Sequence, residues 1–258
     1  MNSILLCEGS TDYTLLQYYM RKAYCWKDER NRQESVFRLK GQKSRKLFCE
    51  KNILTIASAG GCSRLTEGLQ QALKRNQLAP ADSEDVFDHI VIITDRDEIC
   101  TEDDFIRKVQ KVFQENNVCC EEDIHNNRWL KCEMKNNMGE SLCFFFLLLV
   151  IPFEENGAME TFLLNAIAEK DLYDKGIIEK CSDFIDHIDP ERRYLSGRRI
   201  VTKAKFDTYF SIRTSAEQFV ERQNILKSVK WEEYTALQKD FKLLAVLSDT
   251  QEKPGHEI

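Results

Sequence analysis

The sequence lacks several patterns that would place it in a familiar class. None of its ten cysteines forms a Cys-x-x-Cys pair or has a close histidine partner, which argues against a zinc site. The most hydrophobic run, residues 142–153, is shorter than the roughly 20 apolar residues that a membrane-spanning helix needs. No Gly-x-x-x-x-Gly-Lys-Ser/Thr motif is present, which disfavours a nucleotide kinase or a GTPase.

Linkers and leader segments are also missing. No Gly/Ser-rich or Pro-rich stretch divides the 258 residues, and nothing basic or long enough to be a signal peptide leads into Ile4. Cysteines such as Cys7 and Cys143 stand inside apolar runs, where cysteine behaves as a small hydrophobic residue. We therefore expect reduced, structural thiols in a soluble protein of the cytoplasm, with no membrane partner.

What the sequence does contain is a strand followed by a helix, three times over. This order predicts right-handed crossovers and an α/β fold with a mainly parallel sheet flanked by helices. Two further strand-like runs are joined by a plausible hairpin, and the chain from Gly157 onward has the pattern of helices. The expected strands are 3–7, 52–57, 89–94, 129–134 and 143–151. The expected helices begin at Ser10 or Thr11, which would cap the first, and then cover 63–74, 102–116, 158–170, 181–188, 200–212 and 215–247.

This layout predicts one α/β core with a helical C-terminal extension. We expect the core to cover residues 1–155, the helical extension 156–250, and a flexible tail 251–258. The sequence leaves the oligomeric state open between a monomer and a homodimer.

Acidic residues and glycines stand where the three strands end. Glu8-Gly9 follows the first strand, Gly60-Gly61 the second, and the residues from Asp95 to Glu98 the third. Functional groups of open parallel sheets gather beyond the carboxyl ends of the strands. Carboxylates brought together there repel one another unless a hard cation such as Mg²⁺ lies between them, and Mg²⁺ leaves positions for phosphate oxygens. Asp12, four residues after Glu8, is either a further carboxylate of this site or an ordinary first-turn helix acid.

Basic residues are concentrated in two segments on either side of this acidic centre. Residues 21–51 hold eleven Lys and Arg against four Asp and Glu, and residues 192–205 hold six basic residues and no acidic one. This distribution suits a metal site approached by a polyanion, although a solvated helix face would have the same composition. The basic residues that we expect at nucleic acid are Arg45, Lys46, Arg192, Arg193, Arg198 and Arg199.

Three segments together resemble a known family. "ILLCEGSTD", "ASAGGCSRL" and "HIVIITDRDE" resemble the Toprim domain, a Rossmann-like α/β domain shared by topoisomerases, primases and OLD-type nucleases. The shared features are a Glu-Gly after the first strand, a central glycine turn, and an Asp-x-Asp after a later strand. The resemblance covers about the first 110 residues. More loosely, "NGAMETFLLNAI" and "RRIVTKAKFDTYFSI" are similar to the helical extension of small stand-alone Toprim proteins and OLD-type nucleases.

The resemblance implies a role for each matching residue. Glu8 would be the general acid/base or a metal ligand, with Asp95 and Asp97 as metal ligands and Asp12 and Glu98 as auxiliary carboxylates. Glu160 would bind a second metal ion, with Glu155 as the reserve for this role, and Lys203, or else Lys205, would steady the transition state. The cofactor implied is Mg²⁺ or Mn²⁺, as two ions.

These features predict a metal-dependent endonuclease that hydrolyses phosphodiester bonds of DNA or RNA, tRNA included. The family resemblance further implies an effector of bacterial anti-phage defence, controlled by an ATPase partner protein. The chain is too short for the separate tyrosine-bearing domain of a topoisomerase, and it lacks the zinc module usual in primases. A haloacid-dehalogenase-type phosphatase would leave Glu8-Gly9 unexplained. The serious alternative is a non-catalytic Toprim-like module that binds nucleic acid or a partner.

Overall fold

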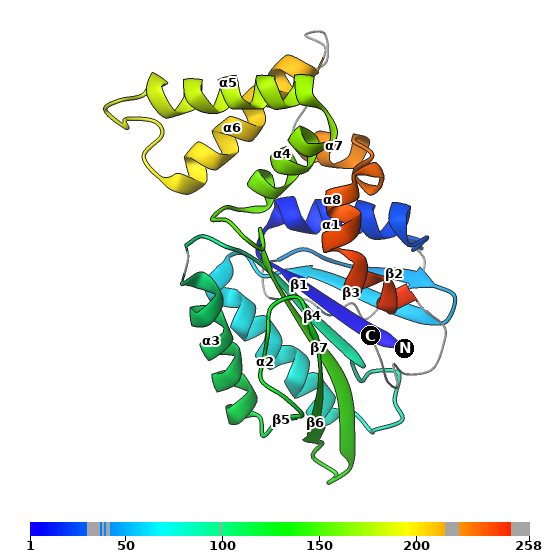
Figure 1. The fold of residues 1–258 in the computed structure, drawn as a ribbon. Helices are drawn as coiled ribbons and strands as arrows, with labels where there is room; N and C mark the ends of the chain where they lie inside the picture. Colours follow the sequence, from blue (N-terminus) through cyan, green and yellow to red (C-terminus); the bar gives the residue numbers. More distant parts are fainter. Residues whose placement is uncertain (30–36, 38, 40–41, 99, 215–221, 249–258) are drawn as a thin grey trace.

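Seven strands form a single sheet in the order β2-β3-β1-β4-β7-β6-β5 (Figure 1). The computed structural model describes residues 1–29, 37, 39, 42–98, 100–214 and 222–248. The strands are β1 Asn2–Cys7, β2 Ser44–Cys49, β3 Asn52–Ser58, β4 His89–Asp95, β5 Cys119–Cys120, β6 Trp129–Lys135 and β7 Ser141–Ile151. The fold class is therefore the expected one, a mostly parallel sheet flanked by helices.

The four central strands are parallel, and this aligns their carboxyl ends along one edge of the sheet. β1 pairs in parallel with β3 and β4, and β4 pairs in parallel with β7. The predicted hairpin is confirmed, since β6 runs antiparallel to β7. Two edge strands, β2 and β5, were not predicted from the sequence. β2 reads Ser-Arg-Lys-Leu-Phe-Cys, and its charged first half hides the strand pattern.

Helices cover both faces of the sheet. α2 (Cys62–Leu78) and α3 (Thr101–Glu115) lie on one face, whereas α1 (Ser10–Ala23), α7 (Arg222–Ser228) and α8 (Thr235–Asp240) lie on the other (Figure 1). Each strand supplies both layers, because successive side chains point to opposite faces. Leu5, for example, packs in the cluster with α1, and its neighbour Leu6 packs in the cluster with α2.

The helical C-terminal region begins after β7. α4 (Met159–Lys170), α5 (Leu172–Ile188) and α6 (Arg198–Arg213) agree with the expected helices, although α5 starts earlier. The long helix expected over 215–247 is wrong, because this region contains α7 (Arg222–Ser228), α8 (Thr235–Asp240) and two 3-10 turns, Trp231–Glu233 and Lys242–Ser248. The breaks allow Trp231 and Phe241 to be buried in the same core. The expected tail 251–258, and residues 215–221, lie outside the described part of the chain.

Two smaller expectations have different outcomes. All ten cysteines are free and Cys7 is buried, but Cys143 is exposed, because the first half of β7 alternates between buried and exposed residues. The first helix is capped by Gly9, not by Ser10 or Thr11. None of the helices in the described part of the chain combines the length and the apolar character needed to cross a membrane.

Candidate active site at the strand ends

A cavity of about 610 Å³ lies beyond the carboxyl ends of β1, β3 and β4. The first turns of α4 and α6 form its other side, and Figure 1 shows both helices beyond this edge of the sheet. We call it the acidic pocket. The chemically active side chains that line it are those of Glu8, Asp12, Asp95, Asp97, Glu160, Arg198, Arg199 and Lys203. The predicted convergence of the acids that close β1 and β4 is therefore observed.

Glu8 is tied directly to the end of β4. Its Oε1 accepts hydrogen bonds from the Thr94 hydroxyl at 2.5 Å and from the Asp95 backbone N–H at 3.1 Å. The backbone N–H groups of Gly60 and Gly61 donate to the Glu8 carbonyl oxygen at 2.8 and 2.9 Å, which joins all three strand ends. Burial raises the pKa of Glu8 above its ordinary value, and the hydrogen bond from Thr94 opposes this rise. A carboxylate with a raised pKa accepts a proton more readily than an ordinary glutamate does.

Asp95 lies at the N-terminus of α4. The Met159 backbone N–H donates to Asp95 Oδ1 at 3.0 Å, and the positive end of the helix dipole favours an anion at this position. Burial nevertheless raises the pKa of Asp95 well above its ordinary value, and the nearby carboxylates of Asp12 and Glu8 raise it further. The ionised form of Asp95 is therefore destabilised in the absence of a cation.

Asp12 is a first-turn residue of α1 and is buried. Its Oδ2 accepts a hydrogen bond from the Gly9 backbone N–H at 2.9 Å. Burial raises the pKa of Asp12 to about 7, repulsion from Glu160 and Glu8 adds to the rise, and Lys203 opposes it. This hydrogen bond is the capping contact of a first-turn helix acid, and the same side chain lines the acidic pocket, so Asp12 combines the two positions that the sequence left open.

Glu160 lies on the pocket side of α4 and is only 3% exposed. Its Oε1 has no hydrogen-bond partner among the described residues. A buried, unpaired carboxylate oxygen is costly, and it indicates a missing positive or hydrogen-bonding group.

The residues of the pocket fit a divalent cation chemically, although they do not form a finished metal cage. Glu8, Asp12 and Asp95 each use one carboxylate oxygen for the contacts above, and their second oxygens accept no hydrogen bond within the described residues. With Glu160 Oε1, these are hard oxygen ligands of the type that Mg²⁺ and Mn²⁺ prefer. No three His, Cys, Asp or Glu side chains of the described residues are grouped closely enough to hold a metal without some side-chain movement.

Three of the cationic residues of the pocket come from α6, and Lys43, which precedes β2, is a further one. Lys203 acts on Asp12 and Arg199 on Glu8, in each case lowering the pKa of the acid. Arg198 pairs with Asp97, with 3.5 Å between a guanidinium nitrogen and Asp97 Oδ1. Asp97 is exposed because β4 ends at Asp95, so Asp97 reaches the rim of the pocket and not its interior.

Several residues expected at the site lie elsewhere. Glu98 is exposed beside the first turn of α3, and Glu155 is exposed and hydrogen-bonded by Asn165, so neither carboxylate lines the pocket. Lys205 pairs with Asp186 at 2.8 Å on the side of α6 away from the acids. Arg192 and Arg193 precede α6 and are exposed outside the pocket.

Arg45 and Lys46 also lie outside the acidic pocket, on β2. Because neighbouring residues of a strand alternate, Arg45 lies on the α1 side of the sheet beside Asp28, whereas Lys46 lines a small cavity near Phe87.

Two residues that shape the site were not singled out from the sequence. Thr94 holds Glu8, and the signal available was a hydroxyl residue inside the apolar run before Asp95. Gly157 precedes α4, and its N–H donates to the Arg96 carbonyl oxygen at 2.8 Å. A Cβ on Gly157 would lie 2.8 Å from Cβ of Thr161, so glycine allows the chain to enter the first turn of α4 at this close distance.

The fold and the site together define an α/β protein with an acidic, cation-flanked cavity at the carboxyl edge of a parallel sheet. The chain belongs to the DUF3226 family, a family described as proteins of unknown function, whose model matches residues 2–244. A solved structure of a hypothetical protein from Pyrococcus horikoshii OT3 is similar over 96% of this chain and 99% of that chain, with 16% sequence identity and a TM-score of 0.49. No curated protein matches the chain.

Proposed function

We propose that this protein is a metal-dependent nuclease that hydrolyses phosphodiester bonds in nucleic acid. The observation that carries the proposal is the clustering of four buried or half-buried carboxylates, from β1, α1, β4 and α4, in one cavity. Two of them, Asp12 and Asp95, have pKa values raised by burial and mutual repulsion, which is the expected state of cation ligands without their cation.

Asp95, Asp12 and Glu160, with Glu8, would hold Mg²⁺ or Mn²⁺. The bound ions would supply positive charge to phosphate oxygens and lower the pKa of a bound water. Glu8 is the residue best suited to move a proton, because its carboxylate is fixed by Thr94 and its pKa is raised.

The cations on α6 are suited to the substrate and to the transition state. Lys203 and Arg199 lie close enough to the acids to affect their pKa values, so they also face whatever these acids hold. Positive side chains at this position would stabilise the negative charge that develops on the phosphate oxygens. Arg198 at the rim would contact the next phosphate of a polyanion.

The test is cleavage of plasmid DNA and of tRNA by purified protein with Mg²⁺ or Mn²⁺. We expect metal-dependent cleavage that Glu8→Gln and Asp95→Asn reduce at least 100-fold. Glu98→Gln is the matched control, because it removes a nearby carboxylate outside the pocket, and it should leave the rate within threefold. Absence of cleavage of both polymers, with either metal and both without and with a co-expressed ATPase partner, would overturn the proposal.

An ATPase partner and a role in anti-phage defence follow from the family resemblance alone. If this regulation holds, the ATPase partner keeps the nuclease silent until it is released, so the cleavage assay is run both without and with a co-expressed ATPase from a neighbouring gene. A second candidate function, a non-catalytic binding module, is favoured by the absence of a finished three-residue metal group among the described residues. For that function Glu8→Gln would have no effect, whereas charge removal at Arg198 and Arg199 would abolish binding.

A further inference from the structure

A second cavity, of about 450 Å³, continues from the acidic pocket along α1. The two cavities share Gln42 and Lys43, which precede β2 and lie beside the turn after β3. We call the second cavity the α1 groove. Its described lining residues are Tyr13, Thr14, Gln17, Tyr18, Arg21, Asp28, Gln42, Lys43, Ser44, Arg45, Gln223 and Lys227.

The walls of the α1 groove give it a direction. One wall is a face of α1, in which Thr14, Tyr18 and Arg21 follow the spacing of one helical side. α1 begins next to Glu8, so this wall leads away from the acids for roughly 12 Å between Tyr13 and Arg21, at about 1.5 Å per residue. The start of β2 and α7 form the opposite wall.

The α1 groove is strongly basic. Arg21, Lys43, Arg45 and Lys227 line it, against the single carboxylate of Asp28, which is paired with Arg45 at 2.5 Å. Within the described part of the chain, the other three cations form no ion pair, so no described carboxylate neutralises their charge. A polyanion is the ligand that such a surface attracts.

An aromatic ring lies among these cations. The guanidinium carbon of Arg21 is 5.2 Å from the centroid of the Tyr18 ring, and Tyr18 is only half-buried. Aromatic rings combined with Arg are the stacking surfaces on which proteins hold unpaired bases, whereas in a duplex the base faces are covered by the neighbouring base pairs. The ring therefore favours a single strand over a duplex.

We propose that the α1 groove binds an unpaired polynucleotide strand that enters the acidic pocket past Lys43. This inference deepens the proposed function, and it rests on that function for the claim that the bound strand is cleaved in the acidic pocket. Binding to the groove can be measured without cleavage, so the two proposals fail separately.

The experiment measures the fluorescence anisotropy of labelled dT15 and U15 oligonucleotides with the full chain in EDTA, over a range of salt concentrations. The double variant Arg21→Ala/Lys227→Ala should weaken binding at least tenfold at low salt. It should also reduce the slope of log Kd against log salt by about 1.4, from two phosphate contacts at about 0.7 each. Tyr18→Ala should weaken binding about tenfold, whereas Tyr18→Phe, which keeps the aromatic ring, should bind with the affinity of the wild type.

Matched controls separate the groove from general charge. Arg107→Ala/Lys111→Ala removes two cations from α3, on the opposite face of the sheet, and should change Kd less than twofold. Melting temperatures establish that each variant is folded. If the groove variants bind as the wild type does, if the wild type does not bind, or if it prefers duplex to single strand, the inference is wrong. If binding depends on the groove but Mn²⁺ produces no cleavage, the groove stands and the nuclease proposal fails.

Discussion

Replacing Asp12 by Asn should make the protein more stable, and the gain should depend on pH. The pKa of Asp12 is about 7 in the folded protein against an ordinary value of 3.8, so ionising it opposes folding. About three pKa units at about 1.36 kcal/mol each give an upper limit near 4 kcal/mol. Because Glu8, Asp95 and Glu160 share the repulsion, we expect Asp12→Asn to raise the free energy of unfolding by about 2–3 kcal/mol at pH 8. Asn can still accept the hydrogen bond that Gly9 donates to Asp12 Oδ2.

The sign of the effect follows from the two protonation states. Below about pH 4 the carboxyl is neutral in the folded and unfolded chains, so the Asn variant and the wild type should have similar free energies of unfolding. Between pH 4 and 7 the unfolded chain ionises first, so the wild type loses stability relative to Asp12→Asn, and above pH 7 the difference is constant. Mg²⁺ or Mn²⁺ should shrink the difference, because a bound cation stabilises the ionised carboxylate.

The assay is urea unfolding at pH 4, 6 and 8 in EDTA, repeated at pH 8 with Mn²⁺. Asp103→Asn is a matched control, since Asp103 occupies the same first-turn position of α3 but is exposed. It should lose a few tenths of a kcal/mol, up to about 1 kcal/mol, through the helix dipole. If Asp12→Asn is destabilising at pH 8, the placement of Asp12 among mutually repelling acids is refuted.

Three further predictions concern other residues. Burial lowers the pKa of His89 from 6.5 to about 4, so the contribution of the neutral ring to stability is fully present above pH 6.5 and is lost as the pH falls. Urea unfolding should show that the free energy of unfolding of the wild type falls between pH 7.5 and pH 5 by about 2 kcal/mol more than that of His89→Phe. Gly60→Ala should destabilise by about 1–2 kcal/mol, because Gly60 has a φ of +84° and an added Cβ would displace the end of the Gln42 side chain. Gly176→Ala in the open surface of α5 should instead stabilise by about 0.5–1 kcal/mol, and calorimetric melting that ranks the two variants the other way would contradict the turn geometry. Lys203→Ala should lower nuclease activity about 100-fold and Lys205→Ala less than threefold, and equal losses would show that position on α6 is unimportant.

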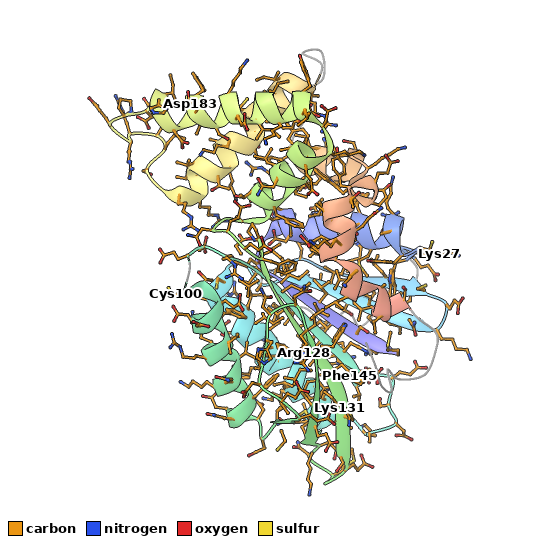
Figure 2. All side chains as sticks on the ribbon, in the orientation of Figure 1. Lys27, Cys100, Arg128, Lys131, Phe145 and Asp183 are labelled. Carbon is orange, nitrogen blue, oxygen red and sulfur yellow. The ribbon has the colours of Figure 1, made fainter. Side chains whose placement is uncertain are left out.

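His89 illustrates how position along a strand separates structural from functional roles. It begins β4, whereas Asp95 ends it, so His89 lies at the edge of the sheet away from the acidic pocket. Its ring stacks on Phe145, labelled in Figure 2, with 5.3 Å between centroids. A histidine buried among aromatic rings, with neither nitrogen hydrogen-bonded among the described residues, is a packing residue.

The parallel core and the convergence of Glu8 with Asp95 could be predicted from sequence, because both follow from strand order. A strand that ends in an acid puts that acid at the carboxyl edge wherever the strands are parallel. The hairpin of β6 and β7 was also predictable from its two apolar runs. β2 was not predictable, because its Arg and Lys residues interrupt the apolar pattern of a strand and its pairing with β3 depends on tertiary contacts.

The helical part of the site was predicted only in part, because sequence spacing does not fix how a helix is rotated. Lys203 and Lys205 were both candidates, and the packing of α6 decides which of them faces the acids. Of the two glutamate candidates, Glu160 is on α4 and lines the pocket, whereas Glu155 lies in the segment before α4. The sequence also did not determine which face of the sheet would carry the basic residues of segment 21–51. Alternation along β2 places Arg45, but not Lys46, on the side of α1.

The most direct test of a cation at the strand ends is a crystal of the protein soaked in Mn²⁺, with anomalous diffraction measured at the manganese edge. The account predicts an anomalous peak inside the acidic pocket, with oxygens of Asp95 and of Glu8, Asp12 or Glu160 as its ligands. A pocket without a peak at saturating Mn²⁺, with these side chains still held by Thr94, Gly9 and Met159, would contradict it.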